Sequence, residues 1–208
     1  MKIVELDGYA ANPGDISWQQ WENIVAPDGT TCEFVVYDRT PANLVVERAK
    51  DADIAITNKV VFSDEVMAQL AIAHLLHITN NIAAHDAAVH QGQWSSCPDF
   101  SFTVSQQLEL DGKTFAVIGL GNTGMATARI AHALGMKVLA YTSKEQSMLP
   151  THIKKANSLD SLFAEADVLS LHCPLTTDTH HIVNAKRLAL MKPTAIIINT
   201  GRGPLIDE

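Results

Sequence analysis

Three glycines in the segment VIGLGNTG have the spacing of a phosphate-binding turn: Gly119, Gly121 and Gly124. The pattern G-x-G-x-x-G is weak by itself, but here a strand-like segment precedes it and a helix-like segment follows. The first glycine permits a tight turn, the second lets the backbone approach a pyrophosphate, and the third allows close packing of helix on strand. The helix N-terminus would offer unpaired N–H groups to the phosphates. A purely structural turn is the alternative, and the context favours a dinucleotide site.

The residues that would meet the ribose follow about 20 positions after this motif, at the end of the next strand. That strand ends at Tyr141, and Thr142, Ser143 and Lys144 come next. No Asp or Glu is present to accept a hydrogen bond from the 2′-hydroxyl of NAD. Two hydroxyls and a lysine can instead receive a 2′-phosphate, which favours NADP. The alternative is that Lys144 is only solvated, so the cofactor is expected to be NAD or NADP, with a slight preference for NADP.

An arginine, Arg202, lies three positions past the end of an apolar, β-branched strand at 195–199. Ligands of doubly wound sheets bind at the carboxyl ends of the strands, where this arginine must lie. Its planar guanidinium suits a bidentate grip on a carboxylate and can polarise an adjacent carbonyl. A surface arginine in a salt bridge is the alternative interpretation.

The elements that would position these residues alternate between strand and helix, which predicts an α/β fold with parallel sheets. In the first part we expect strands at 2–6, 32–37 and 53–57, and helices at 17–24, 43–50 and 64–70. In the second part we expect strands at 114–118, 137–141, 168–172 and 195–199, helices at 125–134, 159–166 and 184–191, and a helix starting at Pro204. A loop is expected at 92–110. The pattern indicates two doubly wound units: an incomplete flavodoxin-like domain at 1–70 and a Rossmann domain at 71–208 that is expected to be incomplete at its C-terminus.

The join between these units is unusual, because a helix ending at Leu70 runs directly into a second helical segment beginning at Ala71. Together they would form one helix over 63–91, which is long and uncapped for an α/β protein. We therefore predict that residues are absent between Leu70 and Ala71.

Composition excludes several classes of function. The chain has 208 residues, 47% of them apolar and 18% charged, with a net charge of −8. It has no basic stripe for nucleic acid, no signal peptide and no apolar run of transmembrane length. The three cysteines match no zinc spacing, which is typical of reduced cytosolic thiols. We expect a cytoplasmic protein with no membrane or nucleic-acid partner. Four histidines could invite a metal, but their helical spacing favours ordinary helix-face residues: His74, His77, His85 and His90.

Three ordered motifs, GKTFAVIGLGNTG, LHCPLTTDT and INTGRGPLIDE, resemble the D-isomer-specific 2-hydroxyacid dehydrogenases. The match is close over 71–208 and looser before it, and the opening LDGYAANPGDISW resembles the glycerate dehydrogenase (hydroxypyruvate reductase) subgroup. The resemblance implies an NAD(P)-dependent oxidoreductase that transfers a hydride to a small 2-oxo acid. Hydroxypyruvate or glyoxylate is the expected substrate, and a homodimer the expected assembly.

The resemblance also gives roles to matching residues. Arg202 matches the family's catalytic arginine. The family's proton donor, a histidine raised in pKa by a glutamate, is expected beyond Glu208, and the HCPLT motif gives His172 a structural place. The positions expected to bind the cofactor are Gly119, Gly121, Asn122, Thr123, Gly124, Thr142, Ser143, Lys144, Cys173, Pro174, Thr179, Thr200 and Gly201; no residue is expected to bind a metal.

Alternatives of the same fold remain open. A non-catalytic dinucleotide sensor, like the C-terminal-binding corepressors, is one. Formate and phosphoglycerate dehydrogenases also share the fold. The acidic charge and the glycerate dehydrogenase-like N-terminus favour an enzyme.

Overall fold

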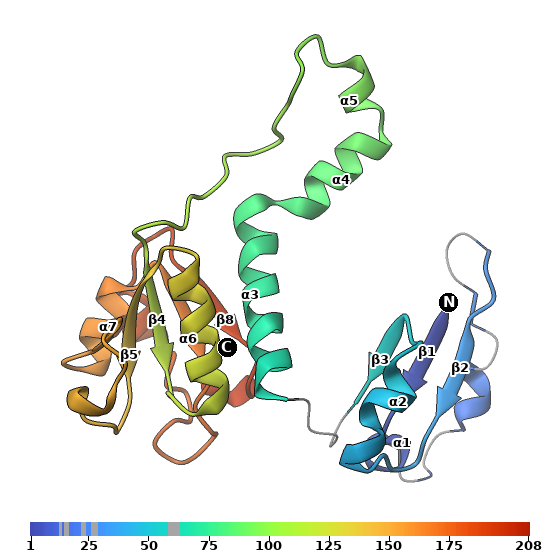
Figure 1. Ribbon diagram of the computed structural model, residues 1–208, viewed down its shortest axis with the longest axis horizontal. Helices are drawn as coiled ribbons and strands as arrows, with labels where there is room; N and C mark the ends of the chain where they lie inside the picture. Colours follow the sequence, from blue (N-terminus) through green and yellow to red (C-terminus); the bar gives the residue numbers. More distant parts are fainter. Residues whose placement is uncertain (13, 15–16, 22–23, 26–28, 58–62) are drawn as a thin grey trace. The chain divides into compact units, whose positions relative to one another are not determined.

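A computed structural model describes residues 1–12, 14, 17–21, 24–25, 29–57 and 63–208 (Figure 1). The chain forms two compact units, Met1–Phe62 and Ser63–Glu208. The expected boundary between residues 70 and 71 lies inside a helix, α3, that belongs entirely to the second unit.

The first unit is a three-stranded parallel sheet with the order β2-β1-β3. Its small core joins Val4 and Leu6 to Val45 on the covering helix. The strands and helices are β1 (Lys2–Glu5), α1 (Gly8–Ala11), η1 (Trp18–Trp21), β2 (Glu33–Val36), η2 (Ala42–Leu44), α2 (Val45–Ala49) and β3 (Ile54–Ile56). The helix expected at 17–24 is a short 3₁₀ turn at 18–21, and residues 22–23 lie outside the described part of the chain.

The second unit contains a five-stranded parallel sheet with the order β6-β5-β4-β7-β8. Because β4 comes first in sequence, the strand order reverses beside it, and β4 and β7 flank the switch point. The strands are β4 (Thr114–Ile118), β5 (Lys137–Tyr141), β6 (Ile153–Lys155), β7 (Val168–Leu171) and β8 (Ile196–Asn199). Four were expected; β6 was missed, because Ile153-Lys154-Lys155 is too short and too polar to show a strand pattern.

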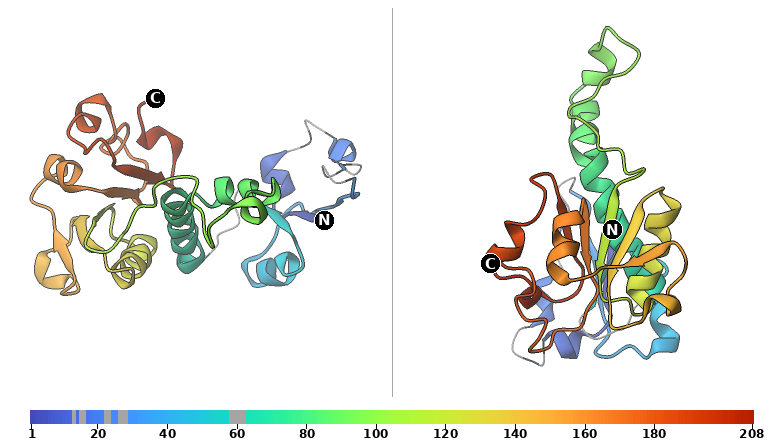
Figure 2. Two further views of the ribbon diagram at one scale, coloured as in Figure 1. Left: turned by 90° about the horizontal axis from the view of Figure 1, so that it is seen from above. Right: turned by 90° about the vertical axis from the view of Figure 1, so that its left-hand side faces the viewer.

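Helices cover both faces of this sheet (Figure 2). Along β4, Phe115 and Val117 face one core, shared with α3 and α6, whereas Ala116 and Ile118 face the other, shared with α7. This alternation is why the strand is apolar at every position. The helices are α3 (Asp64–Asn80), α4 (Ile82–His90), α5 (Gln93–Ser96), α6 (Asn122–Ala133), α7 (Leu159–Glu165) and α8 (Ala185–Leu188), with 3₁₀ turns η3 (Gln146–Met148) and η4 (Gly203–Leu205).

The helical stretch around residue 70 is not one uniform helix. It crosses Leu70 and Ala71 without interruption, ends at Asn80, and restarts after Asn81, whose φ of 50° breaks the helical path. Asn is one of the few side chains that tolerate this left-handed conformation, so the segment 63–91 forms two helices and not one long helix.

Beyond that break, α4, α5 and the returning chain form an arm that projects from the second unit (Figure 1). The ring of Phe102 lies 5.8 Å from that of Trp94 and 6.4 Å from that of His85. The backbone N–H of Val104 donates to His85 Nε2, and Asn81 donates to the hydroxyl of Ser105. The segment expected as a loop at 92–110 therefore begins with a short helix, α5, and is held against α4.

The structure also differs from two expectations about where helices begin. The helix expected to start at Pro204 is the 3₁₀ turn η4, and α6 starts at Asn122, earlier than the expected residue 125. Among the described residues, no helix is long and apolar enough to cross a membrane.

Candidate active site

The glycine-rich turn connects β4 to α6, and each glycine there meets a different constraint. Gly119 has a φ of 89°, and a Cβ on it would lie 2.7 Å from the backbone N of Cys173. A Cβ on Gly124 would lie 2.1 Å from the carbonyl oxygen of Gly119. A Cβ on Gly121 would have no atom within 4 Å. Gly119 and Gly124 are therefore required for packing, whereas Gly121 borders open space of the kind that a pyrophosphate needs.

The N-terminus of α6 begins directly after this open position. No side chain caps the helix, and its first intrahelical hydrogen bond runs from Met125 N–H to the carbonyl of Gly121, at 2.9 Å. The N–H groups of Asn122, Thr123 and Gly124 thus have no partner within the helix. Such groups, with the positive end of the helix dipole, bind phosphate, so the turn fits a dinucleotide.

A second helix N-terminus meets this one. Asp64, in the first turn of α3, accepts a hydrogen bond from the hydroxyl of Thr123. Asp64 and Glu65 are acids in the first turn of α3, where acidic side chains are favoured by the helix dipole in any case. The contact joins residues 59 positions apart, and no local pattern signals it.

The expected ribose-binding residues lie beside the glycine turn. A cavity of about 630 Å³ is lined by the turn, by the end of β5 and by the end of β6. Lys144 reaches across it, and its Nζ donates to the carbonyl of Leu120, 2.8 Å away, inside the turn. The residues that line this cavity include Gly119, Gly121, Thr142, Ser143, Lys144, Asn157, Cys173 and Thr179. Asn157 was missed, because it follows the unrecognised strand β6.

The loop after β7 closes this cavity from the other side. The hydroxyl of Thr179 donates to the carbonyl of Pro174, at 2.6 Å, and accepts from the N–H of Thr176, at 2.8 Å. Thr179 therefore stabilises the loop itself while lining the cavity.

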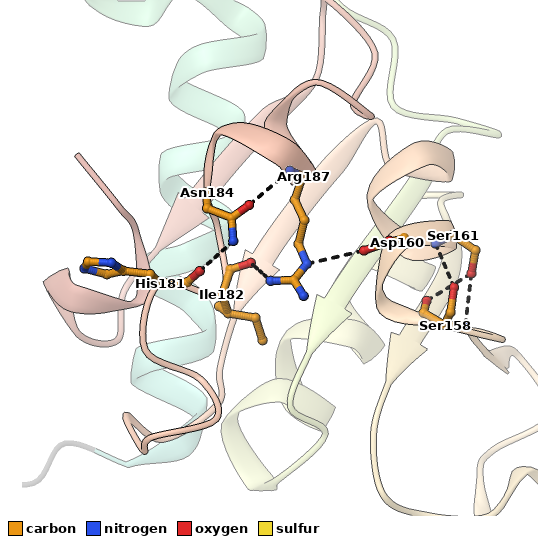
Figure 3. A network of polar contacts seen from close by, with 7 residues as sticks. All are labelled: Ser158, Asp160, Ser161, His181, Ile182, Asn184 and Arg187. Carbon is orange, nitrogen blue, oxygen red and sulfur yellow. Dashed lines mark hydrogen bonds and ion pairs between the residues drawn. The ribbon is translucent and has the colours of Figure 1, made fainter.

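A polar network anchors the far end of the same loop to α7 (Figure 3). The guanidinium of Arg187 donates to the carbonyl of Ile182, at 2.8 Å, and pairs with Asp160 on α7, at 3.4 Å. Asn184 accepts from the N–H of Arg187 and donates to the carbonyl of His181. Ser158 and Ser161 cap α7 through reciprocal hydrogen bonds, which fixes the helix that carries Asp160. The wall of the cavity is thus tied to the body of the unit.

Arg202 lies in a second cavity, of about 540 Å³, next to the switch point. Thr200, Gly201 and Arg202 form one side of it, and Thr123, His172, Cys173 and Pro174 form the other. The Arg202 side chain is exposed, its only hydrogen bond runs from Nη1 to the carbonyl of Gly201, and no ion pair holds it within the described part of the chain. The guanidinium is therefore available to a carboxylate.

Protonation states in this cavity are set by burial. Burial lowers the pKa of His172 to about 4, and its Nε2 lies 2.8 Å from the hydroxyl of the fully buried Ser170. Burial also raises the pKa of the Cys173 thiol. At neutral pH both side chains are uncharged, so His172 has no proton to give as an acid. The contact between His172 and Ser170 is consistent with the structural role, rather than a catalytic one, that the HCPLT motif suggested for His172.

The expected site residues therefore gather around one switch point. Twelve of the thirteen expected cofactor-binding residues, and Arg202, line these two cavities or a smaller one of about 340 Å³ that includes Asn122. Gly124 instead packs beneath the turn.

The histidines considered as metal ligands lie elsewhere. His74 and His77 are on α3, whereas His85 and His90 are on α4 and contact the backbone carbonyls of Asn81 and Asp86. Among the residues that the structure describes, no group of three or more His, Cys, Asp or Glu side chains is placed to hold a metal ion.

The sequence of this second unit matches a known family. Residues 72–208 match the NAD binding domain of D-isomer specific 2-hydroxyacid dehydrogenases. The chain belongs to this family. The expected family, the α/β fold and the class of NAD(P)-dependent oxidoreductase acting on 2-hydroxy acids are thereby confirmed.

Several curated members of the dehydrogenase family are similar to this chain. A hydroxypyruvate reductase of Blautia hydrogenotrophica is 38% identical over 253 positions, covering 100% of this chain and 76% of the relative. A hydroxypyruvate reductase of Thermotoga maritima is 38% identical over 167 positions, covering 80% of this chain and 52% of the relative. The chain thus spans between about half and about three quarters of these relatives. The first alignment has 253 positions against 208 residues here, so at least 45 positions have no counterpart in this chain.

Solved structures share the fold of this chain. A protein of Thermus thermophilus is 26% identical with a TM-score of 0.63, covering 100% of this chain and 76% of that one. The D-lactate dehydrogenase of Escherichia coli has a TM-score of 0.61 at 24% identity, with the same coverage, and supports the fold alone.

Proposed function

We propose that this dehydrogenase reduces a small 2-oxo acid reversibly with NAD(P)H, and that hydroxypyruvate or glyoxylate is its substrate. The observation that carries this proposal is the exposed Arg202, free of carboxylate partners among the described residues, in a cavity beside the glycine turn. The names of relatives support the substrate class: hydroxypyruvate reductases, and a glyoxylate reductase of Thermococcus litoralis that is 35% identical over 167 positions.

When bound, the nicotinamide ring supplies or accepts the hydride. The chain's own residues would bind and orient the cofactor and the substrate. In our proposal, the free N–H groups at the start of α6 hold the pyrophosphate, and the walls formed by Thr142, Ser143 and Thr179 enclose the adenosine side. Cys173, Pro174, Thr200 and Gly201 border the nicotinamide side.

Arg202 would grip the substrate carboxylate with two parallel N–H···O bonds and polarise the neighbouring carbonyl. This holds the carbonyl carbon in one orientation, which is a large part of what a positioned group contributes to rate. We assign no proton-donor role to His172, because a group with a pKa of about 4 is already deprotonated at neutral pH.

For the cofactor, we propose a preference for NADPH. The cationic side chain of Lys144 and the hydroxyl-bearing side chains of Thr142 and Ser143 line the adenosine cavity together. No carboxylate forms an ion pair with Lys144 within the described residues, so its ammonium is available to a 2′-phosphate.

We further propose that residues 1–62 form part of a substrate domain and that the protein is a homodimer. The arm supports the second point, because it carries Trp94 and Phe100, whose exposed fractions are 57% and 95%. Aromatic side chains of this size are enriched in protein interfaces. Sedimentation equilibrium of the protein and of its Phe100→Ser variant tests the dimer.

The decisive experiment measures the loss of NADH or NADPH absorbance with hydroxypyruvate and with glyoxylate, in the wild type and in Arg202→Lys. We expect the variant to lose at least about 100-fold in kcat/KM, because lysine cannot reproduce the bidentate grip. Its affinity for NADH should be unchanged, which serves as the internal control. Tight NADH binding with no turnover of any 2-oxo acid by the wild type would instead support a dinucleotide sensor.

A further inference from the structure

The backbone that carries Arg202 is held from within by one side chain, that of Asn199. The carboxamide oxygen of Asn199 accepts the N–H of Gly201 at 3.0 Å, and its nitrogen donates to the carbonyl of Arg202 at 3.0 Å. Asn199 is the last residue of β8, so the turn leaves the sheet directly from this residue. The carboxamide therefore bridges the strand end to both sides of the peptide unit that joins Gly201 to Arg202.

The chemistry of the two contacts requires a carboxamide. One contact needs an acceptor and the other needs a donor, so only one orientation of the amide satisfies both. Asp has no donor for the carbonyl of Arg202, and Leu of similar size has neither group. A Cβ on Gly201 would lie 3.4 Å from the carboxamide oxygen, which is ordinary van der Waals contact.

The rest of the turn is anchored on its far side. The fully buried Leu205 packs into the core that includes α7, and its carbonyl accepts from Val183 N–H at 3.0 Å. The N–H of Asp207 donates to the carbonyl of Val183 at 2.9 Å. The strand β8 holds the backbone before Arg202, and the contacts of Leu205 and Asp207 hold it after Arg202. The two hydrogen bonds of Asn199 therefore determine the course of the backbone between these two anchors.

We propose that Asn199 is a positioning residue: it orients the peptide unit before Arg202 so that the guanidinium points into the 540 Å³ cavity. The inference rests on the proposed role of Arg202 as the group that binds the substrate carboxylate. Asn199 itself does not line that cavity.

The test uses Asn199→Leu, which removes both hydrogen bonds at similar size, and Asn199→Asp, which keeps only the acceptor. Asn80→Leu, at an exposed asparagine in the last turn of α3, is the matched control. The first measurement is amide hydrogen exchange of Gly201 by NMR. The second is the affinity of the NADH-loaded protein for oxamate, a stable mimic of a 2-oxo acid, with Arg202→Lys as the reference.

We expect exchange at Gly201 to become about tenfold faster in Asn199→Leu and to change little in Asn199→Asp, because only Leu removes the acceptor. Both variants should bind oxamate about tenfold more weakly, whereas NADH affinity and the exchange of Ile198 in β8 stay as in the wild type. Asn80→Leu should match the wild type in every measurement.

Two results would overturn the inference: unchanged Gly201 exchange in Asn199→Leu, or unchanged oxamate affinity in both Asn199 variants while Arg202→Lys loses it. A failure of the proposed function looks different, since oxamate would then bind the wild type and Arg202→Lys equally, or bind neither. In that case the exchange of Gly201 alone decides whether Asn199 holds the turn.

Discussion

Two glycines three residues apart in the same turn should respond to substitution in opposite ways. Gly121→Val is expected to abolish dinucleotide binding while the protein stays folded. Gly124→Ala is expected to destabilise the fold, although the added group is smaller. The contrast arises because a Cβ at Gly121 meets nothing within 4 Å, whereas a Cβ at Gly124 would lie 2.1 Å from the carbonyl oxygen of Gly119.

The magnitudes follow from those surroundings. Gly121 has φ −74° and ψ −161°, which any residue adopts, so valine there loses only the preference of an N-cap for glycine, about 1 kcal/mol. At Gly124 the obstacle is backbone that cannot retreat, because Gly119 is itself packed so closely against the loop after β7 that a Cβ built on it would lie 2.7 Å from the backbone N of Cys173. Overpacking of this kind costs about 3 kcal/mol or more. In a unit of this size, 1 kcal/mol lowers Tm by about 2–4 °C, so Gly124→Ala should melt roughly 6–12 °C lower.

Thermal melts by circular dichroism and calorimetric titrations with NADH and NADPH measure both effects. Gly121→Val should melt within about 4 °C of the wild type and bind both cofactors at least about 100-fold more weakly, which corresponds to roughly 2.7 kcal/mol. Unchanged affinity of Gly121→Val for both cofactors would refute the assignment of the turn as the pyrophosphate site. A Gly124→Ala protein as stable as the wild type would refute the packing argument.

Three further predictions concern charge. Lys144→Ala should weaken NADPH binding about tenfold more than NADH binding, roughly 1.4 kcal/mol, by calorimetric titration; equal losses would mean that Lys144 serves only the pyrophosphate or the solvent. Burial lowers the pKa of His172 to about 4, so stability should fall as pH drops below the unfolded value of 6.5 and level off below 4. The loss is at most about 3 kcal/mol, and urea unfolding of His172→Gln should lack it. Burial alone would raise the pKa of Asp167, but hydrogen bonds from Lys192 and from the N–H of Thr114 outweigh it and lower that pKa. The contribution of Asp167 to stability is therefore present above the unfolded pKa and is lost as pH falls through the lower folded pKa. Urea unfolding between pH 5 and pH 2 should show a smaller loss of stability in Asp167→Asn than in the wild type. An identical loss in both proteins would contradict a lowered pKa of Asp167.

Local patterns were sufficient to predict much of the second unit. The strands at 114–118 and 137–141 have the expected bounds, because residues 114–118 are all apolar or β-branched and residues 138–141 are all apolar, a pattern typical of a strand buried on both faces. The glycine spacing predicted the turn after the first of these strands, since a strand, a glycine-rich turn and a helix follow one another directly along the chain. Short elements with mixed composition were the failures: β6 was missed, and the helices expected at residues 17 and 204 are 3₁₀ turns.

The sequence by itself determined the fold class, the dinucleotide turn and the identity of the arginine at the sheet edge. These depend on residue type and on spacing over a few positions, where chain geometry leaves few choices. The tertiary structure alone decided which distant groups meet: Thr123 with the side chain of Asp64, 59 positions away, and Lys144 with the backbone carbonyl of Leu120, 24 positions away. It also decided that His172 is neutral, because burial depends on the whole set of elements packed around a residue. Contacts between distant residues arise only when strands and helices pack, and a pattern along the chain does not record them.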